Sequence, residues 1–157
     1  MLLDRKTFST VIDATPLVSI DLIILNGQGQ ALLGERLNRP AKGFWFVPGG
    51  RIFKGESIVE AFERLTKEEL GQPFSFMDAT LLGPYDHFYG DSVYGDELNT
   101  HYVAIAYVLK LPTELHNLPL NVQHGKYKWF EISELLSDSN VHLHTKWYFE
   151  KLKNSQV

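Results

Sequence analysis

Residues 17–25 are apolar apart from Ser19 and Asp21. A short run of this kind, rich in β-branched side chains, is typical of a strand that is buried on both faces of a sheet. The turn-forming sequence Asn-Gly-Gln-Gly at residues 26–29 follows it and leads into a second apolar run at residues 31–36. The pattern therefore predicts a hairpin of two strands near the start of the chain.

The best-supported helix begins after Ser57. Ser57 and Glu60 form a capping-box sequence, and apolar residues at 58, 62 and 65 recur at helical spacing. The pattern ends at Leu70, before a glycine suited to a C-cap, Gly71. Weaker periodicities predict three more helices, one after the N-cap residue Asp4 and the others over residues 132–136 and 141–153.

Three further strands are predicted at residues 80–89, 101–110 and 126–130. The first two flank a loop rich in glycine and acids, residues 90–97, which is long enough to cover a site. Residues 37–42 form another predicted loop, ahead of an aromatic run. Strands interrupted by one strong helix, with helices at both ends, predict an α/β fold in which helices cover a mixed sheet.

Composition narrows the class of protein. A chain of 157 residues with 44% hydrophobic content suffices for one core, so we expect a single domain over residues 1–157. The net charge of -4 argues against a nucleic-acid partner, although a local basic pocket for a phosphorylated small molecule is compatible with it. The absence of cysteine excludes disulfides and thiolate chemistry. We find no signal peptide or membrane-spanning stretch in the sequence, and so expect no membrane partner and a cytoplasmic location.

The most specific motif starts at Gly50. This glycine is followed at fixed intervals by Glu56, by Arg64 and by the run Glu68-Glu69-Leu70-Gly71, which gives a loop feeding a helix with a carboxylate-rich face. Such a face suits magnesium and phosphates, because Mg²⁺ prefers hard oxygen ligands. The motif resembles the Nudix box, whose family hydrolyses nucleoside diphosphates linked to another moiety. The resemblance implies the Nudix α/β/α sandwich with a mixed β-sheet.

The resemblance also implies a metal site. In the family, the glycine just before the box binds metal through its carbonyl and the second of the paired acids binds it directly, and these positions are Gly49 and Glu69. Glu68 then assists the coordination, and Arg64 braces the carboxylates of the helix. We expect Mg²⁺ as cofactor, and the same acids permit Mn²⁺. Without the motif, paired acids at a helix end would be interpreted as solvated charge.

One anchor of the box is missing. Leu65 stands where the family usually has a glutamate, and Thr66 and Gln72 replace residues that are usually aliphatic. The segments around the box resemble one Nudix subfamily, the GDP-mannose mannosyl hydrolases, in which the same glutamate is lost. The similar segments extend over most of the chain and comprise residues 15–21, 33–36, 38–41, 43–51, 100–102 and 123–124.

The subfamily resemblance implies an unusual reaction for a Nudix protein. Water attacks the anomeric carbon of GDP-mannose or GDP-glucose, and GDP and the free sugar are released with inversion. Since the leaving group is already a diphosphate, one metal ion and a few arginines can stabilise the charge that it gains. Inversion also requires a base that holds water on the opposite face of the sugar. A homodimer is implied as well, with the apolar amino-terminal helix as a contributor to it.

His124 is the candidate base, because it matches the catalytic histidine of the subfamily. A histidine has an ordinary pKa of about 6.5, which suits proton abstraction near neutrality. The resemblance makes the adjacent Gln123 a metal ligand through its amide oxygen. A metal ligand beside the base would position the imidazole only when substrate and metal are present.

Four more residues complete the predicted site. Arg36 and Arg51 match arginines that face the diphosphate, and a guanidinium binds phosphate oxygens in bidentate fashion. Asp21 and Tyr102 match residues near the sugar and the leaving group. Each has a structural alternative: surface solvation for the arginines, a salt bridge for Asp21 and core packing for Tyr102.

Two other functional classes stay open at this point. A standard Nudix pyrophosphohydrolase would direct water to phosphorus and release GMP and a sugar phosphate, and Leu65 argues against it. A non-catalytic nucleotide-sugar binding module would bind without turnover, and the presence of Glu69, Gln123 and His124 argues against that. The sequence does not distinguish GDP-mannose from GDP-glucose, since the two sugars differ at a single hydroxyl.

Overall fold

The computed structural model describes residues 2–112, 115, 118 and 124–155. Helices and strands alternate along the chain in a pattern close to the predicted one. In chain order the elements are α1 Arg5–Ala14, β1 Leu17–Leu25, β2 Ala31–Arg36, β3 Trp45–Phe46, β4 Gly49–Arg51, α2 Ile58–Leu70, the 3-10 helix η1 Phe76–Asp78, β5 Ala79–Tyr89, β6 Thr100–Lys110, β7 His124–Phe130, α3 Ile132–Ser137 and α4 Leu143–Ser155.

The strands form one mixed sheet with β1 near its centre. The main order is β3-β2-β1-β6-β5, while β4 pairs with β1 and β7 pairs with β2. β1 and β6 are parallel along their whole length, from Leu17 opposite Tyr102 to Leu25 opposite Lys110. The other pairs are antiparallel. Such a mixed sheet is what the sequence predicts.

The predicted hairpin of β1 and β2 opens almost at once. The two strands pair only where Leu25 faces Ala31. Farther along, β4 takes the same edge of β1, with Gly49 opposite Asp21, and β7 pairs with the full length of β2. The predicted hairpin is confirmed next to its turn, and beyond it other strands pair with the backbone groups of β1 and β2. The sheet forks at this place, and the fork positions the site described below.

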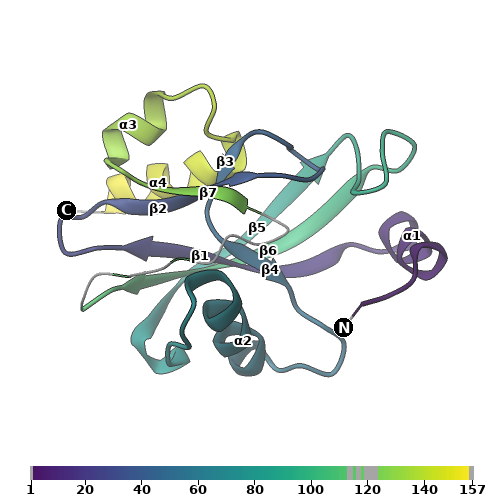
Figure 1. The fold of residues 1–157 in the computed structure, drawn as a ribbon, viewed down its shortest axis with the longest axis horizontal. Coiled ribbons are helices and arrows are strands. Elements are labelled where there is room, and N and C mark those ends of the chain that lie inside the picture. The colour runs from purple at the N-terminus through teal and green to yellow at the C-terminus, as the bar shows by residue number, and fades with distance from the viewer. Residues whose placement is uncertain (1, 113–114, 116–117, 119–123, 156–157) are drawn as a thin grey trace.

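Two hydrophobic cores lie on the two faces of the sheet. α2 packs Phe62 and Leu65 against one face, together with Ile20 and Leu22 of β1. α3 and α4 pack against the other face, where Tyr148 and Phe149 of α4 lie in the same cluster as Ile23. Figure 1 shows α2 on one side of the sheet and α3 and α4 on the other. This arrangement confirms the α/β/α sandwich, and β1 contributes to both cores because successive side chains of a strand alternate.

The local signals read from the sequence are confirmed at the helix ends. Asp4 accepts a hydrogen bond from the Thr7 N–H at 2.7 Å. Ser57 and Glu60 form both bonds of the capping box. Gly71 ends α2 with a φ of 83°, a left-handed conformation that glycine adopts without strain.

Among the differences from the prediction, three concern β4, β7 and the start of α4. The start of the motif loop is in fact the strand β4, which short length and glycine content concealed. β7 begins at His124, two residues before the predicted start. The last helix begins at Leu143 and not at 141, because Val141 forms a bridge with Trp45.

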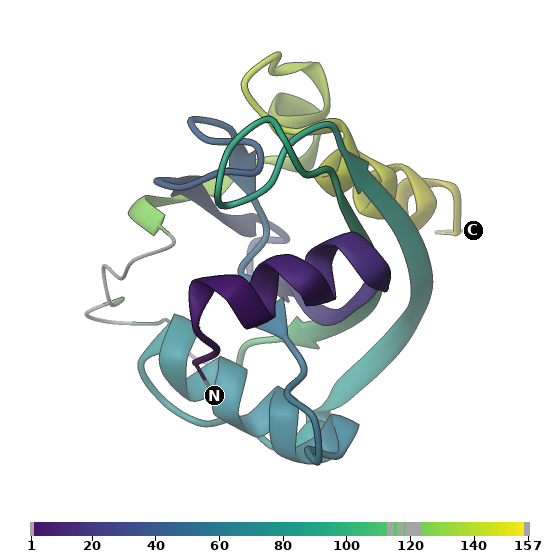
Figure 2. The same cartoon turned by 90° about the vertical axis from the view of Figure 1, so that its right-hand side faces the viewer.

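α1 lies across one end of the layered structure. Figure 2 looks onto this helix, which lies in front of the sheet between α2 and the loop that joins β5 to β6. Phe8 of α1 makes an edge-to-face contact with Tyr94 of that loop, with ring centroids 6.1 Å apart. In the described part of the chain, no helix has the length and apolar character needed to cross a membrane.

Candidate active site

A cavity of about 400 Å³ opens where the sheet forks, in the range of about 300–1,000 Å³ that small-molecule sites occupy. α1, the strands β1, β2, β4, β5 and β6 and the helix α2 all contribute to its wall. Four arginines and two carboxylates line it: Arg36, Arg39, Arg51, Arg64, Asp21 and Glu68. A chain with a net charge of -4 therefore concentrates positive charge in this cavity, which favours an anionic ligand.

The carbonyl group of Gly49 points away from β1. The Leu22 N–H donates to the Pro48 carbonyl at 2.8 Å, so Leu22 and Pro48 form a hydrogen-bonded pair between β1 and the chain at β4. Hydrogen-bonded and non-hydrogen-bonded pairs alternate along antiparallel strands, so the next pair, Asp21 and Gly49, is not hydrogen-bonded. Carbonyls two residues apart in a strand point the same way, and the carbonyl of Arg51 accepts a bond from Arg64 of α2 at 2.9 Å. Only glycine fits at position 49, because a Cβ atom would meet the Ile20 carbonyl oxygen and would lie 2.7 Å from Asp21 Oδ1.

Arg64 holds the motif loop against α2. Its guanidinium donates to both carboxylate oxygens of Glu56, at 2.7 and 2.9 Å, and to Glu68 at 3.1 Å. Glu56 in turn accepts the N–H of Phe53 at 2.8 Å, and the Arg64 guanidinium lies 4.0 Å from the centre of that ring. The geometry is that of a brace between strand, loop and helix, which agrees with the role that the resemblance implied.

Leu65 is an apolar part of the cavity wall. Its side chain is 2% exposed and lies against Gly50, where a Cβ atom would be only 2.6 Å from Leu65 Cδ2. No carboxylate can therefore act from this position of the helix. The two neighbouring anionic positions are Glu68, which lines the cavity, and Glu69, which is 2% exposed.

Glu69 and Gly49 offer the kind of oxygen atoms that Mg²⁺ binds. The Tyr127 hydroxyl lies 3.3 Å from Glu69 Oε2. Among the residues that the structure describes, no three histidine or acidic side chains cluster as a metal site. Mg²⁺ does not need three such side chains, however, because the ion keeps several waters and substrate phosphates among its ligands. The carboxylate of Glu69 and the carbonyl of Gly49 are therefore suitable protein ligands for Mg²⁺.

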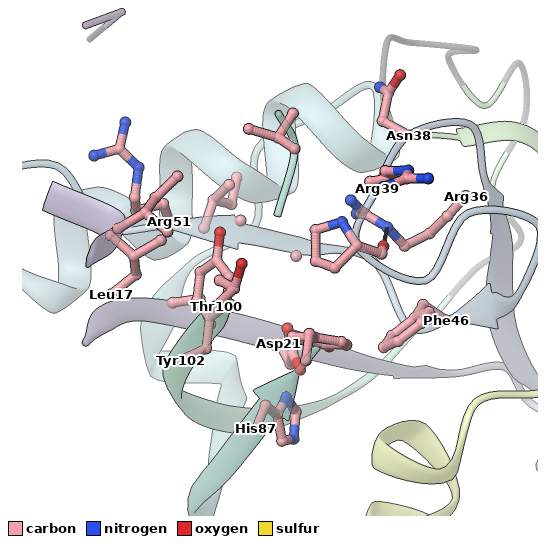
Figure 3. Close-up of a pocket in the computed structure, with 18 of the residues that line it drawn as sticks. Leu17, Asp21, Arg36, Asn38, Arg39, Phe46, Arg51, His87, Thr100 and Tyr102 are labelled. Carbon is pink, nitrogen blue, oxygen red and sulfur yellow. Dashed lines mark hydrogen bonds between the residues drawn. The ribbon is translucent and has the colours of Figure 1, made fainter. Parts of the chain in front are cut away.

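Arginines stand at two ends of the cavity, as Figure 3 shows. At one end Arg51 is held between two aromatic rings, 4.6 Å from the centre of Phe8 and 5.2 Å from that of Phe53. At the other end Arg36 donates to the Pro40 carbonyl at 3.1 Å. Neither arginine is a simple surface residue, because both side chains are half-buried and line the cavity.

Arg39 also lines the cavity, and the sequence did not predict it as a site residue. It pairs with Asp96 at 2.7 Å, and its distance from Asp91 is 3.8 Å. Both acids belong to the loop between β5 and β6. Arg39 lies beside a proline in the predicted loop, but nothing in the spacing indicated that it would pair with the loop between β5 and β6.

The acidic residue of β1 lies on the cavity floor. Asp21 accepts a hydrogen bond from the Tyr148 hydroxyl at 2.5 Å, and that hydroxyl also lies 3.2 Å from His87 Nε2. Burial raises the pKa of Asp21 to about 6, although the Tyr148 bond and the charge of Arg36 act in the opposite direction. Asp21 is thus both hydrogen-bonded and part of the cavity, with no salt bridge among its described contacts.

A group of histidines and aromatic rings surrounds His87. The His87 ring stacks on that of His144, with centroids 4.3 Å apart, and His142 stacks on Phe46 at 4.6 Å. Burial lowers the pKa of all three histidines, to about 3 for His87 and about 4 for the other two. These rings are therefore neutral near pH 7. His87 lines the cavity, although no sequence motif indicated it as a site residue.

One tyrosine of β5 and one of β6 face the same cavity. Tyr102, which the sequence left between core and site, belongs to its wall, as does Tyr89. Their rings meet edge to face with centroids 6.5 Å apart. Burial raises the pKa of the Tyr102 hydroxyl, and the nearby charges of Arg36 and Arg51 oppose that rise. Tyr102 therefore remains a neutral hydroxyl that can donate or accept a hydrogen bond.

The predicted base and one predicted metal ligand are at the limit of the described chain. The Cα of His124 is opposite that of Arg36 in the pairing of β2 and β7. The first residue of β7 therefore lies at the Arg36 end of the cavity. Gln123 lies outside the described residues. Seven of the eight predicted site residues therefore have a described backbone, and Asp21, Arg36, Arg51, Tyr102 and Gly49 line one cavity.

Comparison with known proteins gives this arrangement a family. Residues 15–151 match the NUDIX domain. The low-salt glycan biosynthesis protein Agl8 of Haloferax volcanii is 40% identical over 127 residues, which are 79% of this chain and 76% of that protein. The 8-oxo-dGDP phosphatase NUDT18 of Mus musculus is 43% identical over only 49 residues, which are 31% of this chain and 15% of that protein.

Solved structures share the fold. The MutT NUDIX hydrolase from Burkholderia pseudomallei has a TM-score of 0.70 and 27% identity and covers 88% of this chain and 98% of its own. The MutT protein from Methanosarcina mazei Go1 has a TM-score of 0.71 at 20% identity, with 90% and 96% covered. Because the domain match covers most of the chain and includes the motif and most of the cavity wall, this protein belongs to the Nudix hydrolase family.

Proposed function

We propose that this Nudix hydrolase cleaves a GDP-sugar, GDP-mannose or GDP-glucose, into GDP and the free sugar by attack of water at the anomeric carbon. The observation that carries the proposal is Leu65. This buried apolar side chain fills the position from which the box usually supplies a carboxylate, and it packs against Gly50 in the cavity wall. A helix without that acid is poorly equipped to activate water beside phosphorus.

The charge of the cavity supports a diphosphate as the leaving group. Arg36 and Arg51 stand at its two ends, and guanidinium groups can bind phosphate oxygens through two parallel hydrogen bonds. Because such hydrogen-bond donors are in position before the reaction starts, they stabilise the negative charge that develops on the departing oxygen. Phe8 and Phe53 hold Arg51 in place, which reduces the entropy that its ordering would cost.

The sugar would occupy the part of the cavity that is floored by Asp21 and His87. Water attacks the anomeric carbon, the bond from that carbon to the β-phosphate oxygen breaks, and its electrons leave with GDP. His124 takes the proton of the attacking water. Gly49, Glu69 and Gln123 would hold a Mg²⁺ ion, which supplies positive charge to the diphosphate when bound.

The name of one relative supports a substrate that carries a sugar. The Haloferax volcanii protein is named as a glycan biosynthesis protein. We further propose that the chain acts as a homodimer, which light scattering of the purified protein would test.

Incubation with GDP-mannose, Mg²⁺ and ¹⁸O-labelled water tests the site of attack. We expect GDP together with mannose that carries the label. Label in phosphate, with GMP and mannose phosphate as products, would instead show an ordinary pyrophosphohydrolase. Binding of GDP-mannose without any turnover would favour the binding module.

A pair of histidine variants tests the base. We expect His124→Gln to lower kcat by about 10²–10⁴-fold, the usual contribution of a general base, while GDP still binds. His101→Gln is the matched control, because His101 does not line the cavity. A folded His124→Gln protein with full turnover would remove His124 from the mechanism.

A further inference from the structure

The hydroxyl of Tyr148 joins two strands beneath the cavity floor. Tyr148 belongs to α4 and is fully buried. Its oxygen lies 2.5 Å from Asp21 Oδ2 of β1 and 3.2 Å from His87 Nε2 of β5. Asp21 and His87 line the cavity, whereas Tyr148 does not. The Tyr148 hydroxyl therefore acts on the site through these two side chains.

The protons of this network can be assigned from its chemistry. A phenol has one proton to donate, and an ionised carboxylate can only accept. With Asp21 ionised, the Tyr148 hydroxyl must donate to Oδ2 of Asp21, so its oxygen is free to accept from Nε2–H of His87. His87 is neutral because burial, followed by the neighbouring His144 and His142, lowers its pKa to about 3. A neutral imidazole with its proton on Nε2 has a lone pair on Nδ1.

Both outer atoms of the network are open to the cavity. No hydrogen bond described for the chain uses His87 Nδ1 or Asp21 Oδ1. The enclosed side-chain nitrogen and oxygen atoms that lack a partner in the described part of the chain are His101 Nε2 and His144 Nδ1. His87 Nδ1 and Asp21 Oδ1 are not among these enclosed atoms, and both residues line the cavity. The floor consequently presents two hydrogen-bond acceptors.

We propose that Tyr148 is a positioning residue, which fixes the tautomer of His87 and the orientation of Asp21 so that the cavity floor accepts hydrogen bonds from a hydroxyl-bearing part of the substrate. This inference rests on the proposed function where it takes that part to be the sugar of a nucleotide sugar. The tautomer itself follows from the network alone. A phosphate or a ketone would find no donor in these two groups, whereas neighbouring hydroxyls would find two acceptors.

Nitrogen NMR of the histidine rings tests the tautomer without any substrate. At pH 8 and in the presence of EDTA, we expect His87 of the native protein to carry its proton on Nε2, with its signals assigned by their loss in His87→Gln. Tyr148→Phe should shift His87 toward a mixture of tautomers. Tyr85→Phe is the matched control, since the Tyr85 ring packs edge to face on Tyr148 at 4.7 Å and none of the described hydrogen bonds uses its hydroxyl.

Either of two NMR results would overturn the proposal. One is a proton on Nδ1 of His87 in the native protein, a result that does not depend on whether any variant folds. The other is a folded Tyr148→Phe protein whose His87 spectrum is unchanged. The expected shift in Tyr148→Phe, together with an unchanged spectrum in Tyr85→Phe, would support it.

Kinetics separate the positioning role from a purely structural one. We expect Tyr148→Phe to lower kcat/KM for GDP-mannose by about 10-fold, the effect of about one net hydrogen bond, and to leave the inhibition constant of GDP within about two-fold. Equal weakening toward GDP and GDP-mannose would indicate general damage and contradict the proposal. If the native protein does not turn over GDP-mannose, the proposed function fails, while the NMR result still decides the role of Tyr148.

Discussion

The ion pair between Arg64 and Glu56 should couple the stability of the motif loop to that of α2. The guanidinium donates to both oxygens of Glu56, at 2.7 and 2.9 Å, and the two side chains are 22% and 18% exposed. Removing one partner of a fully buried pair costs about 3–5 kcal/mol, whereas an exposed pair contributes about 0–1 kcal/mol. This pair lies between these limits, so we expect a coupling free energy of about 2 kcal/mol.

A double-mutant cycle measures that coupling. Arg64→Gln should lower the free energy of unfolding by about 2–3 kcal/mol, since it also loses the bonds to Glu68 and the Arg51 carbonyl. Glu56→Gln should cost less, because a carboxamide oxygen still accepts the Phe53 N–H. The double variant should be less destabilised than the sum of the two.

Urea unfolding followed by circular dichroism gives the four free energies, with the slope against urea checked for constancy. Glu63→Gln and Lys67→Gln on the exposed face of α2 are matched charge controls and should each change stability by less than about 0.5 kcal/mol. A coupling below about 0.5 kcal/mol would refute the view that this pair braces the loop, however short its distances.

Three other predictions concern the cavity wall. Asp21 has a pKa of about 6 in the folded chain and an ordinary value of 3.8, so between these values the folded state keeps a proton that the unfolded chain releases. The free energy of unfolding should therefore fall by up to about 3 kcal/mol as pH rises from about 4 to 6. Urea titrations in EDTA should show this slope in the native protein and a flatter one in Asp21→Asn. Gly49→Ala should lose at least about 2 kcal/mol because its Cβ meets the Ile20 carbonyl, whereas Gly27→Ala, with open space around it, should be neutral within about 0.5 kcal/mol in the same assay. EDTA should abolish turnover of GDP-mannose and added Mg²⁺ should restore it, while Glu69→Gln should raise the Mg²⁺ concentration needed for half-maximal activity; activity that persists in EDTA would argue against a metal.

The parts of the fold that sequence predicted well are those with local signals. α2 is bounded by a capping box and a glycine, so its ends follow from residues within a few positions of each other. Partners of strands follow less directly. β1 pairs along its whole length with β6, which is some 80 residues away, and no local pattern indicates that choice. The glycine-rich strand β4 was missed because its residues carry no strand propensity.

The residues of the candidate site also fall into those that a local sequence motif predicts and those that it does not. The Nudix motif indicated Gly49, Arg64 and Glu69 because their spacing is fixed by one loop and one helix. Tyr148 was not predicted, since 127 residues separate it from Asp21 and it would be interpreted as core from its helical position. A buried carboxylate in an apolar strand does signal that some distant partner exists. It does not say which residue supplies it.

The wall formed by α1 has a consequence for how relatives of this protein differ. The domain match begins at residue 15, whereas Leu2, Phe8 and Ile12 precede it and line the cavity. Phe8 also stacks on Arg51, so a segment outside the common domain helps to set the position of a charged group inside it. Two chains with the same box and the same sheet can thus offer pockets of different depth and rigidity, according to what precedes their first strand. In this protein, the residues before the matched domain shape the pocket together with the motif.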